Sequence, residues 1–310
     1  MEHTAPRSHR LVNEARRHGP APTGVVYPCT GPSLAGALEA AEAGLIDPFL
    51  IGPEHRMREI AEQQGIDLHG CRLEKAATEH ESAARAAELA RDGRVGMLMK
   101  GSLHTDELMG ILVSRSAGLR TDRRISHTFV MEIPVHDRLL LVTDAAINIA
   151  PDLEAKRHIT QNAIDVAHAV GISNPHIAIL SAVENSNPAI PSSMHAAELR
   201  DMARSGLITG GIVDGPLAFD NMISQEAAQL KGIDSPVSGA TDIAVLPGLE
   251  AGNILYKSLV YISKATAGGV VMGAKIPVIL TSRADSVHSR ISSAAVARLV
   301  NYTARNPGHG

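Results

Sequence analysis

The feature of this sequence that most constrains its fold is a repeated alternation of short apolar runs with longer segments of helical periodicity. The run GVVYP (24–28) has the length of a buried strand, and an alanine- and leucine-rich segment from Ser33 to Gly44 follows it. The same order recurs at FLIG, at VGMLMKG and then along most of the chain. Repeated strand–helix units of this kind predict a mainly parallel sheet with helices on both faces.

The pattern changes once, shortly after residue 125. There the strand-like runs ISHTFVMEIP and RLLLVTDAA are separated only by VHD, which predicts a hairpin and marks a domain boundary. Strand–helix alternation then resumes and ends with IPVILTS and a last helix. We therefore predict two three-layer α/β/α domains with mainly parallel sheets: a discontinuous first domain over 1–125 and 269–310, and a second domain over 126–268.

Composition excludes several classes of function. A net charge of −4 and 2% aromatic residues provide neither a basic field nor a stacking surface, so nucleic acid is not an expected partner. No apolar run has the length of a membrane span, and the polar start lacks the apolar stretch of a secretory signal, so we expect a cytoplasmic protein without membrane contact. Cys29, Cys71 and the scattered histidines match no zinc-binding spacing, and we predict no metal site.

Polar residues that follow the apolar runs are the candidate site residues, because ligands of open α/β sheets gather at the carboxyl ends of strands. The segment MLMKGSLHTDE offers a cation and helix-start amides to an anion, and a capped helix with a solvated lysine is the alternative. A helix cap and a turn residue are the alternative roles for Asp144 and Asn148. The candidates at these and two later strand ends are Lys100, Gly101, His104, Thr105, Asp144, Asn148, Glu184, Asp214 and Gly215.

The stretch PVILTSRADS (277–286) carries the strongest candidates. Its polar residues directly follow the apolar ones and precede the last predicted helix: Ser282, Arg283, Asp285 and Ser286. A guanidinium together with helix amides would make a phosphate site. The alternative is a capping residue beside a surface ion pair. We favour an anionic ligand, because so many polar or small residues follow the strand.

A basic cluster before the predicted boundary is either a further anion contact or a solvated loop, and it consists of Arg120, Arg123 and Arg124. The common nucleotide and hydrolase motifs are missing from the sequence. It contains no GxGxxG after a strand, no GxxxxGK[ST], no HExxH and no GxSxG. The residues alone therefore predict a two-domain α/β protein with anion-binding strand ends, and they leave the reaction open.

Several stretches spread in order through most of the chain carry a more specific signal. They are MKGSLHTDEL (99–108), LRTDRRISHTFVMEIP (119–134), TDAAINIAPDLEAK (143–156), AILSAVE (178–184), DGPLAFDNMIS (214–224), GLEAGNILYK (248–257) and PVILTSRADS (277–286). Their order and spacing resemble the phosphate acetyltransferase and phosphate butyryltransferase family. The resemblance looks closer to the butyryltransferase branch, and to the acyltransferase part of fusions with enoyl-CoA hydratase, than to the acetyltransferases of acetate metabolism.

The resemblance implies reversible transfer of a short acyl group between coenzyme A and inorganic phosphate, so acyl-CoA, phosphate and acyl phosphate are the expected partners. It implies an active-site cleft between two domains of the isopropylmalate dehydrogenase type, no metal, coenzyme A as a substrate with no permanently bound cofactor, and a homodimer or larger homo-oligomer. Carried onto this chain, it places Arg283 on the phosphoryl group and Ser282 near the reacting carbonyl. The residues that should line the opposite wall of the cleft are Asp144, Asn148, Glu184, Asp214 and Gly215.

Two positions depart from the pattern of the acetyltransferases that this chain resembles. Ser289 stands where those enzymes have an aspartate proposed as the base, and the arginine that follows their HT pair is missing. Asp285 is the nearest replacement base, although a helix start lowers the pKa of a carboxyl group. Removal of the thiol proton by a phosphate oxygen is the alternative. Lys100 or an arginine of the 120–124 cluster would supply the missing cation.

Two other functions are compatible with these patterns. A protein that binds coenzyme A or acyl phosphate without catalysis would keep the fold after loss of the base. A metal- and NAD-dependent hydroxy-acid dehydrogenase shares the general architecture, and Asp214 and Asp220 would be its candidate metal ligands. Phosphate-dependent release of free coenzyme A from acyl-CoA distinguishes the transferase from both.

Overall fold

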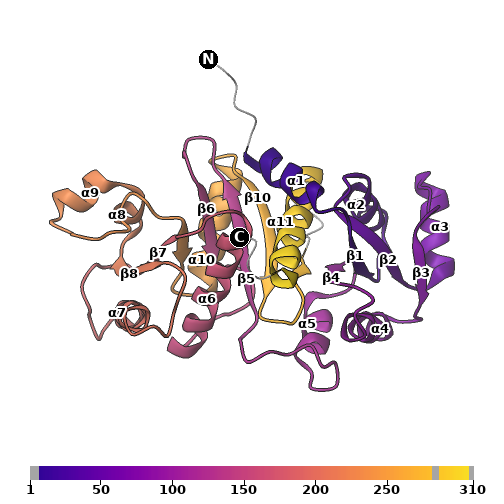
Figure 1. Ribbon diagram of the computed structural model, residues 1–310, viewed down its shortest axis with the longest axis horizontal. Helices are drawn as coiled ribbons and strands as arrows, with labels where there is room; N and C mark the ends of the chain where they lie inside the picture. The colour runs from indigo at the N-terminus through magenta and orange to yellow at the C-terminus, as the bar shows by residue number, and fades with distance from the viewer. Residues whose placement is uncertain (1–6, 281–285, 307–310) are drawn as a thin grey trace, which may run out of the picture. The chain divides into compact units, whose positions relative to one another are not determined.

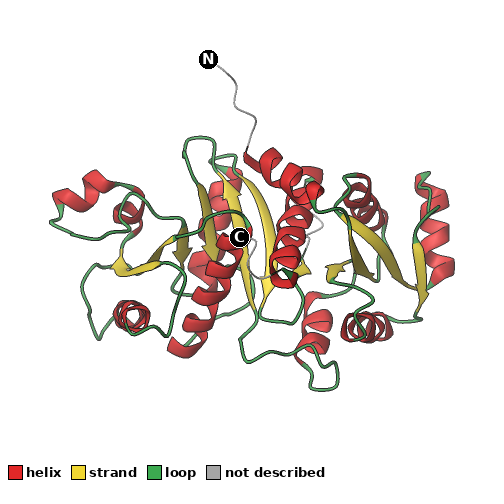
Figure 2. Ribbon diagram, viewed as in Figure 1, coloured by secondary structure: helices red, strands yellow, loops and turns green. Residues whose placement is uncertain are grey.

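The structure is a computed structural model that describes residues 7–280 and 286–306. The chain forms two compact units, which we call unit 1 (Met1–Arg123 and Gly268–Pro307) and unit 2 (Arg124–Ala267). Unit 1 is discontinuous in sequence, because the chain leaves it at Arg123 and re-enters it at Gly268. Each unit has its own run of neighbouring strands, flanked by helices (Figures 1 and 2).

The strands of unit 1 are arranged in the order β3-β2-β1-β4-β11-β10. Their bounds are Ala21–Val26 (β1), Ile46–Gly52 (β2), Arg72–Lys75 (β3), Met97–Lys100 (β4), Thr266–Met272 (β10) and Val278–Ile279 (β11). The first five in this order pair in parallel, and β10 is antiparallel to β11. Central strands such as β1 and β4 are apolar at nearly every position because both of their faces are covered.

Helices cover both faces of the unit 1 strands (Figure 1). Their bounds are Arg7–Arg17 (α1), Gly31–Glu42 (α2), Glu54–Gln64 (α3), Glu79–Arg91 (α4), Thr105–Val113 (α5) and Val287–Arg305 (α11). Helices α1, α11, α2 and α3 pack side by side, whereas α4 and α5 pack together. Arg298 connects α11 to the segment that follows α1. Its guanidinium donates to the carbonyls of His18 and Gly19 at 2.5 and 2.7 Å.

The strands of unit 2 are arranged in the order β5-β6-β9-β7-β8. Their bounds are Ser126–Glu132 (β5), Leu139–Thr143 (β6), His176–Leu180 (β7), Ile212–Leu217 (β8) and Ile243–Val245 (β9). β5 and β6 form the predicted antiparallel hairpin, and the other pairs are parallel. The helices are Leu153–Ala169 (α6), Pro191–Arg204 (α7), Phe219–Ile223 (α8), Gln225–Leu230 (α9) and Leu249–Tyr261 (α10). One face of these strands packs into a core with Met222 of α8 and the apolar side of α10.

The predicted mixed α/β class with mainly parallel sheets is confirmed, whereas some element boundaries were wrong. Strand β8 continues to Leu217, so Asp214 lies inside a strand that the sequence predicted to end there. Helix α10 stops at Tyr261, and the glycine-rich segment from Thr266 is strand β10, which was not predicted. The glycine has a packing reason, because a Cβ on Gly268 would stand 2.7 Å from the backbone of Ser292 in α11. Helix α1 and strand β3 were not predicted.

Candidate active site

The carboxyl ends of the parallel strands bring the first predicted residues to one edge of the unit 1 sheet. Val26 at the end of β1 is in register with Lys100 at the end of β4, and Met99 is in register with Ile279 of β11. Lys100 and the end of β11 therefore share the edge at which open sheets bind ligands. The predicted residues that follow β11 in sequence, Ser282, Arg283 and Asp285, lie outside the described residues.

The loop after β4 is held against the loop after β1. The N–H of Gly101 donates to Val26 O at 2.9 Å, and the Ser102 hydroxyl donates to Tyr27 O at 2.8 Å. A Cβ on Gly101 would stand 2.4 Å from Val26 O and 2.6 Å from Tyr27 O, closer than a carbon and a carbonyl oxygen can approach. The position therefore requires glycine. Gly101, which the sequence predicts as part of an anion-binding loop, is thus also required by the packing of this loop against the end of β1.

The cation and the helix start next to this loop also have defined contacts. Lys100 Nζ donates to Leu103 O at 3.0 Å and to Gly101 O at 3.3 Å, which fixes the charge at the end of β4. His104 is the N-cap residue of α5, and its N–H donates to Glu79 Oε2 at 3.3 Å. The side chains of His104 and Thr105 are exposed. This edge therefore offers two exposed polar side chains beside a positioned ammonium group.

Two further predicted residues of unit 1 lie in contrasting surroundings. Ser286 is the N-cap of α11, and its hydroxyl accepts a hydrogen bond from the Ser289 N–H at 3.1 Å. Capping, the alternative role considered for this stretch, is therefore the observed role of Ser286. Arg120 is exposed and forms an isolated antiparallel bridge with Ala274.

In unit 2, Asp144 and Asn148 form one buried cluster directly after β6. Asp144 Oδ1 accepts hydrogen bonds from the N–H groups of Ala146 and Ile147 at 2.9 and 3.1 Å. Asp144 Oδ2 accepts from the Asn148 N–H at 3.2 Å and from Asn148 Nδ2 at 2.6 Å. Only 2% of Asp144 and 5% of Asn148 is exposed. The spacing of four residues allows the carboxylate to organise the turn that holds the amide.

Glu184 and Asp214 belong to separate clusters of unit 2. Glu184 Oε1 accepts from Asn221 Nδ2 and from Lys231 Nζ, both at 2.7 Å, and Lys231 lowers the pKa of this carboxyl group. Asp214 accepts from the Ser235 hydroxyl at 2.5 Å and from the Gly215 N–H at 2.9 Å. The five residues predicted from sequence to line one wall of the cleft are therefore divided among three separate hydrogen-bonded clusters.

The acids considered as metal ligands of a dehydrogenase also have other partners. Asp220 pairs with Lys231 at 2.8 Å, and the Asp214 contacts are those given above. Within residues 7–280 and 286–306, no group of three His, Cys, Asp or Glu side chains has an arrangement that could hold a metal ion. Over the same residues, none of the helices combines the length and apolar character needed to cross a bilayer.

Buried titratable groups in unit 2 had no clear signal in the sequence. Burial lowers the pKa of His127 to about 4, and its Nδ1 has no hydrogen-bond partner in the described part of the chain. Burial also lowers the pKa of Lys156 on α6 to about 8. Lys156 is 3% exposed, although lysine is rarely buried. The helical period around Lys156 predicts α6 but does not indicate that this position faces inward.

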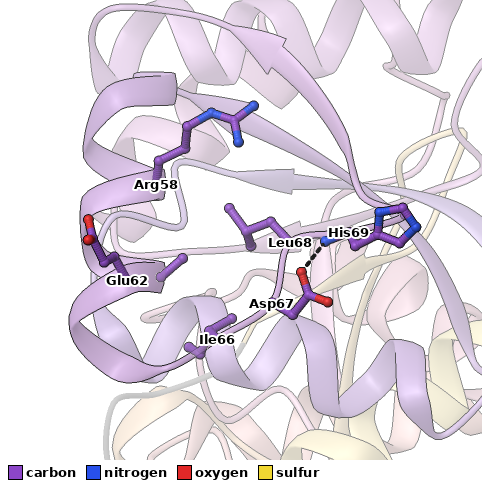
Figure 3. A pocket seen from close by; sticks show the side chains of 8 residues that line it. Arg58, Glu62, Ile66, Asp67, Leu68 and His69 are labelled. Carbon is purple, nitrogen blue, oxygen red and sulfur yellow. Dashed lines mark hydrogen bonds between the residues drawn. The ribbon is translucent and has the colours of Figure 1, made fainter.

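Two hollows occur in unit 1 near its edge strands. One, of about 720 Å³, lies at the carboxyl ends of β2 and β3 and is lined by Pro53, His55, Lys75 and neighbouring residues. The other, of about 520 Å³, lies between the C-terminal half of α3 and the loop that precedes β3, where Asp67 Oδ1 accepts from the His69 N–H (Figure 3). Among the predicted site residues that the structure describes, none lines either hollow.

Comparison with known proteins identifies the protein family of this chain. The family model of phosphate acetyl/butaryl transferase matches residues 74–298, which include every predicted site residue. The chain belongs to this family. A phosphate acetyltransferase from Rhizobium meliloti is 54% identical over 296 residues, which cover 96% of this chain and 93% of that protein. A probable phosphate butyryltransferase from Bacillus subtilis is 45% identical over 84% of this chain and 87% of that protein.

A solved structure agrees with the sequence relationship. A branched-chain phosphotransacylase from Enterococcus faecalis superimposes with a TM-score of 0.77 at 32% identity, covering 90% of this chain and 99% of that one. The family predicted from the strand-end stretches is therefore confirmed. The identities do not favour the butyryltransferase branch over the acetyltransferases, because the acetyltransferase from Rhizobium meliloti has the higher identity of the two relatives.

Proposed function

We propose that this protein catalyses the reversible transfer of a short-chain acyl group between coenzyme A and inorganic phosphate. The observation that carries the proposal is the 54% identity to a phosphate acetyltransferase over nearly the whole chain. The family match through residues 74–298 supports it, because it includes the strand-end residues at which ligands of open α/β sheets bind. The function is thus that of an acyltransferase with coenzyme A as a substrate.

The chemistry requires three groups from the protein. In the direction of acyl-CoA synthesis, the thiolate of coenzyme A attacks the carbonyl carbon of the acyl phosphate, a C–S bond forms, and the C–O bond to phosphate breaks. A cation must bind the phosphoryl group, a donor must stabilise the developing oxyanion, and a base must take the thiol proton. We assign these roles to Arg283, Ser282 and Asp285 respectively.

Residues of the described part would complete the phosphate environment on the unit 1 edge. Lys100 holds its charge at the end of β4, and the amides at the start of α5 lie next to it in sequence. A cation and helix-start amides both favour an anion. We therefore propose Lys100, Gly101, His104 and Thr105 as substrate-binding residues, and Ser286 as the cap that fixes the start of α11 after the Ser282–Arg283 pair.

The deciding experiment is release of free coenzyme A, followed with a thiol reagent, from acetyl-, propionyl-, butyryl- and isobutyryl-CoA. Each acyl-CoA is assayed with phosphate, without phosphate, and with sulfate in its place, in metal-free buffer. Release that requires phosphate supports the transferase, and comparison of kcat/KM values identifies the preferred acyl group. Folded protein that binds coenzyme A but releases none from any of the four would support a binding protein instead.

A further inference from the structure

Arg124, the first residue of unit 2, is held at three points by other residues of that unit. Its N–H donates to His158 Nδ1 at 2.9 Å, and its carbonyl accepts from Asn162 Nδ2 at 2.9 Å. Its Nε donates to Asn148 Oδ1 at 2.7 Å. His158 and Asn162 are four residues apart on α6, so one face of this helix holds the backbone of Arg124. Both the main chain and the inner nitrogen of the guanidinium therefore have fixed positions.

The two residues behind the guanidinium use most of their hydrogen-bonding groups within the fold. Asn148 Oδ1 accepts from Arg124, and the two N–H groups of Nδ2 donate to Asp144 Oδ2 and Ile125 O at 2.6 and 2.9 Å. The Asp144 carboxylate already accepts four hydrogen bonds, all from residues 146–148. A carboxylate has about four lone-pair sites. Both N–H groups of Asn148 Nδ2 and the four sites of the Asp144 carboxylate are therefore occupied within the fold, and one lone pair of Asn148 Oδ1 remains.

The outer nitrogens of Arg124, in contrast to Asn148 and Asp144, are not occupied by hydrogen bonds within the described part of the chain. Its side chain is exposed, and Nη1 and Nη2 have no hydrogen-bond or ion-pair partner among residues 7–280 and 286–306. With Nε bonded to Asn148, the guanidinium presents its two terminal nitrogens side by side. This fork matches two oxygens of a phosphate group.

The location of Arg124 agrees with such a role. Strand β5 begins two residues after Arg124, and its antiparallel register pairs Thr128 with Thr143 at the end of β6. The start of β5 therefore lies beside the carboxyl end of β6. Because β6, β9 and β7 are parallel, their carboxyl ends occupy the same edge. Arg124 thus stands at the edge of the unit 2 sheet where ligands of open sheets bind.

We propose that Arg124 binds a phosphate group of a substrate through Nη1 and Nη2, and that Asn148 and Asp144 are positioning residues that act through Arg124. The inference rests on the proposed function. It differs from the sequence-based assignment, in which Asp144 and Asn148 contact the substrate themselves. It also selects one arginine of the 120–124 cluster as the cation missing after the HT pair. The phosphate group belongs either to the transferred phosphate or to coenzyme A, and the experiment separates the two.

The test is steady-state kinetics of four variants, with phosphate and acyl-CoA varied in turn. We expect Arg124→Ala to raise one of the two KM values at least tenfold and to change kcat less than threefold. Arg124→Lys keeps the charge but loses the fork, and it should recover part of the affinity. Asn148→Ala should raise the same KM, and Arg124→Ala/Asn148→Ala should be no worse than Arg124→Ala. Such non-additivity is the signature of one residue acting through another.

Arg204→Ala is the matched control. Arg204 lies in the last turn of α7, with a side chain that is 69% exposed and an Asp201 carboxylate at 3.7 Å. This variant removes the same charge from the same unit and should leave both KM values unchanged. The thermal midpoint of every variant is measured, so that loss of fold is not counted as loss of binding. If Asn148→Ala does not fold, the comparison of Arg124→Ala with Arg124→Lys still decides the role of Arg124.

The source of the phosphate group follows from which KM rises. A rise for phosphate alone assigns Arg124 to the transferred group, and a rise for acyl-CoA alone assigns it to coenzyme A. In the second case, acyl-dephospho-CoA distinguishes the 3′-phosphate from the pyrophosphate. If Arg124 contacts the 3′-phosphate, wild type and Arg124→Ala have the same KM for this substrate. If Arg124 contacts the pyrophosphate, the difference between the two KM values remains.

The inference and the proposed function fail in different ways. Turnover by the wild type with both KM values unchanged in folded Arg124→Ala would overturn the inference alone. Additive effects in the double variant would remove the positioning role of Asn148. If the wild type releases no coenzyme A, the proposed function fails, and calorimetric titration of wild type and Arg124→Ala with coenzyme A and with inorganic phosphate then decides whether Arg124 binds either anion.

Discussion

The hydroxyl oxygens of Ser286 and Ser289 lie 3.1 Å apart, and the Ser286 oxygen also accepts a hydrogen bond from the Ser289 N–H. Both hydroxyls therefore belong to the first turn of α11. By the resemblance described in the sequence analysis, Ser289 stands where the acetyltransferases have an aspartate proposed as the base. An unactivated hydroxyl bonded within a helix cap does not take a proton from a thiol at neutral pH, and we therefore propose that another group is the base.

We expect Ser289→Ala to retain at least half of the wild-type turnover, and Asp285→Asn to lose at least tenfold. The reason is that Asp285 is the nearest carboxylate to the Ser282–Arg283 pair in sequence. The measurement is the pH profile of kcat/KM for both variants. The acidic limb should be that of the wild type in Ser289→Ala and should disappear in Asp285→Asn. Near-normal rate and profile in Asp285→Asn would leave a phosphate oxygen of the substrate as the base.

Arg283→Ala should lower turnover by more than tenfold. Loss of a cation that stabilises the phosphoryl group in the transition state raises the barrier by at least about 1.4 kcal/mol, which corresponds to that factor. Arg305→Ala, in the last turn of α11, removes the same charge and should not change turnover. Rates are compared at saturating phosphate and acyl-CoA. A loss of less than tenfold would show that Arg283 does not hold the phosphoryl group.

Lys156→Met should stabilise the protein at pH 7. Burial lowers the pKa of Lys156 to about 8 in the folded state, whereas in the unfolded chain it stays near 10.4. Below pH 8 the buried charge therefore costs about 3 kcal/mol. Because the unfolded state binds more protons between about pH 8 and 10.4, wild-type stability rises with pH across that interval. The gain from Lys156→Met should accordingly shrink as pH rises.

Urea unfolding of wild type and Lys156→Met at pH 7 and pH 9.5 checks this expectation. The difference in free energy of unfolding should favour the variant at pH 7 and fall at pH 9.5. Equal differences at the two pH values would mean that the lysine is not desolvated. A variant that is less stable at both would mean that the ammonium has a stabilising partner.

Gly101→Ala should destabilise unit 1 by about 1–3 kcal/mol, because the added Cβ would overlap the carbonyls of Val26 and Tyr27. Gly110→Ala is the matched control, because a Cβ at this position in α5 has no atom within 4 Å. That substitution should stabilise the helix by up to about 1 kcal/mol. Chemical unfolding measures both changes, and equal effects of the two substitutions would contradict the close approach at Gly101.

The sequence predicts the class of fold well because hydrophobic periodicity is local. The alternating runs indicate the βα units and the hairpin of β5 and β6. Segments whose pattern depends on distant packing were missed. Strand β10 is an example, because its Gly268 is explained only by the backbone of Ser292 in α11, far along the chain. The local sequence there reads as a helix end followed by a loop.

The ends of the strands can be located from the apolar runs, and the candidate site residues were chosen at those ends. The partners of each residue could not be predicted, because hydrogen bonds between distant segments leave no local pattern. Asp144 and Asn148 have the spacing of an organised turn, but nothing in the sequence connects Asn148 to Arg124. Asn162 and His158 could have been found by extending the helical period of α6 and asking what its inner face contacts.

The split of unit 1 has a consequence for the order in which a newly made chain folds. Strand β11 pairs with β4, and Arg298 of α11 bonds to the carbonyls of His18 and Gly19. Both partners follow unit 2 in sequence, so the segment of unit 1 that precedes unit 2 pairs with them only after unit 2 has been synthesised. Unit 2 is contiguous from Arg124 to Ala267 and can complete its own sheet during synthesis. Unit 1 thus starts to be synthesised before unit 2 but can be completed only after it.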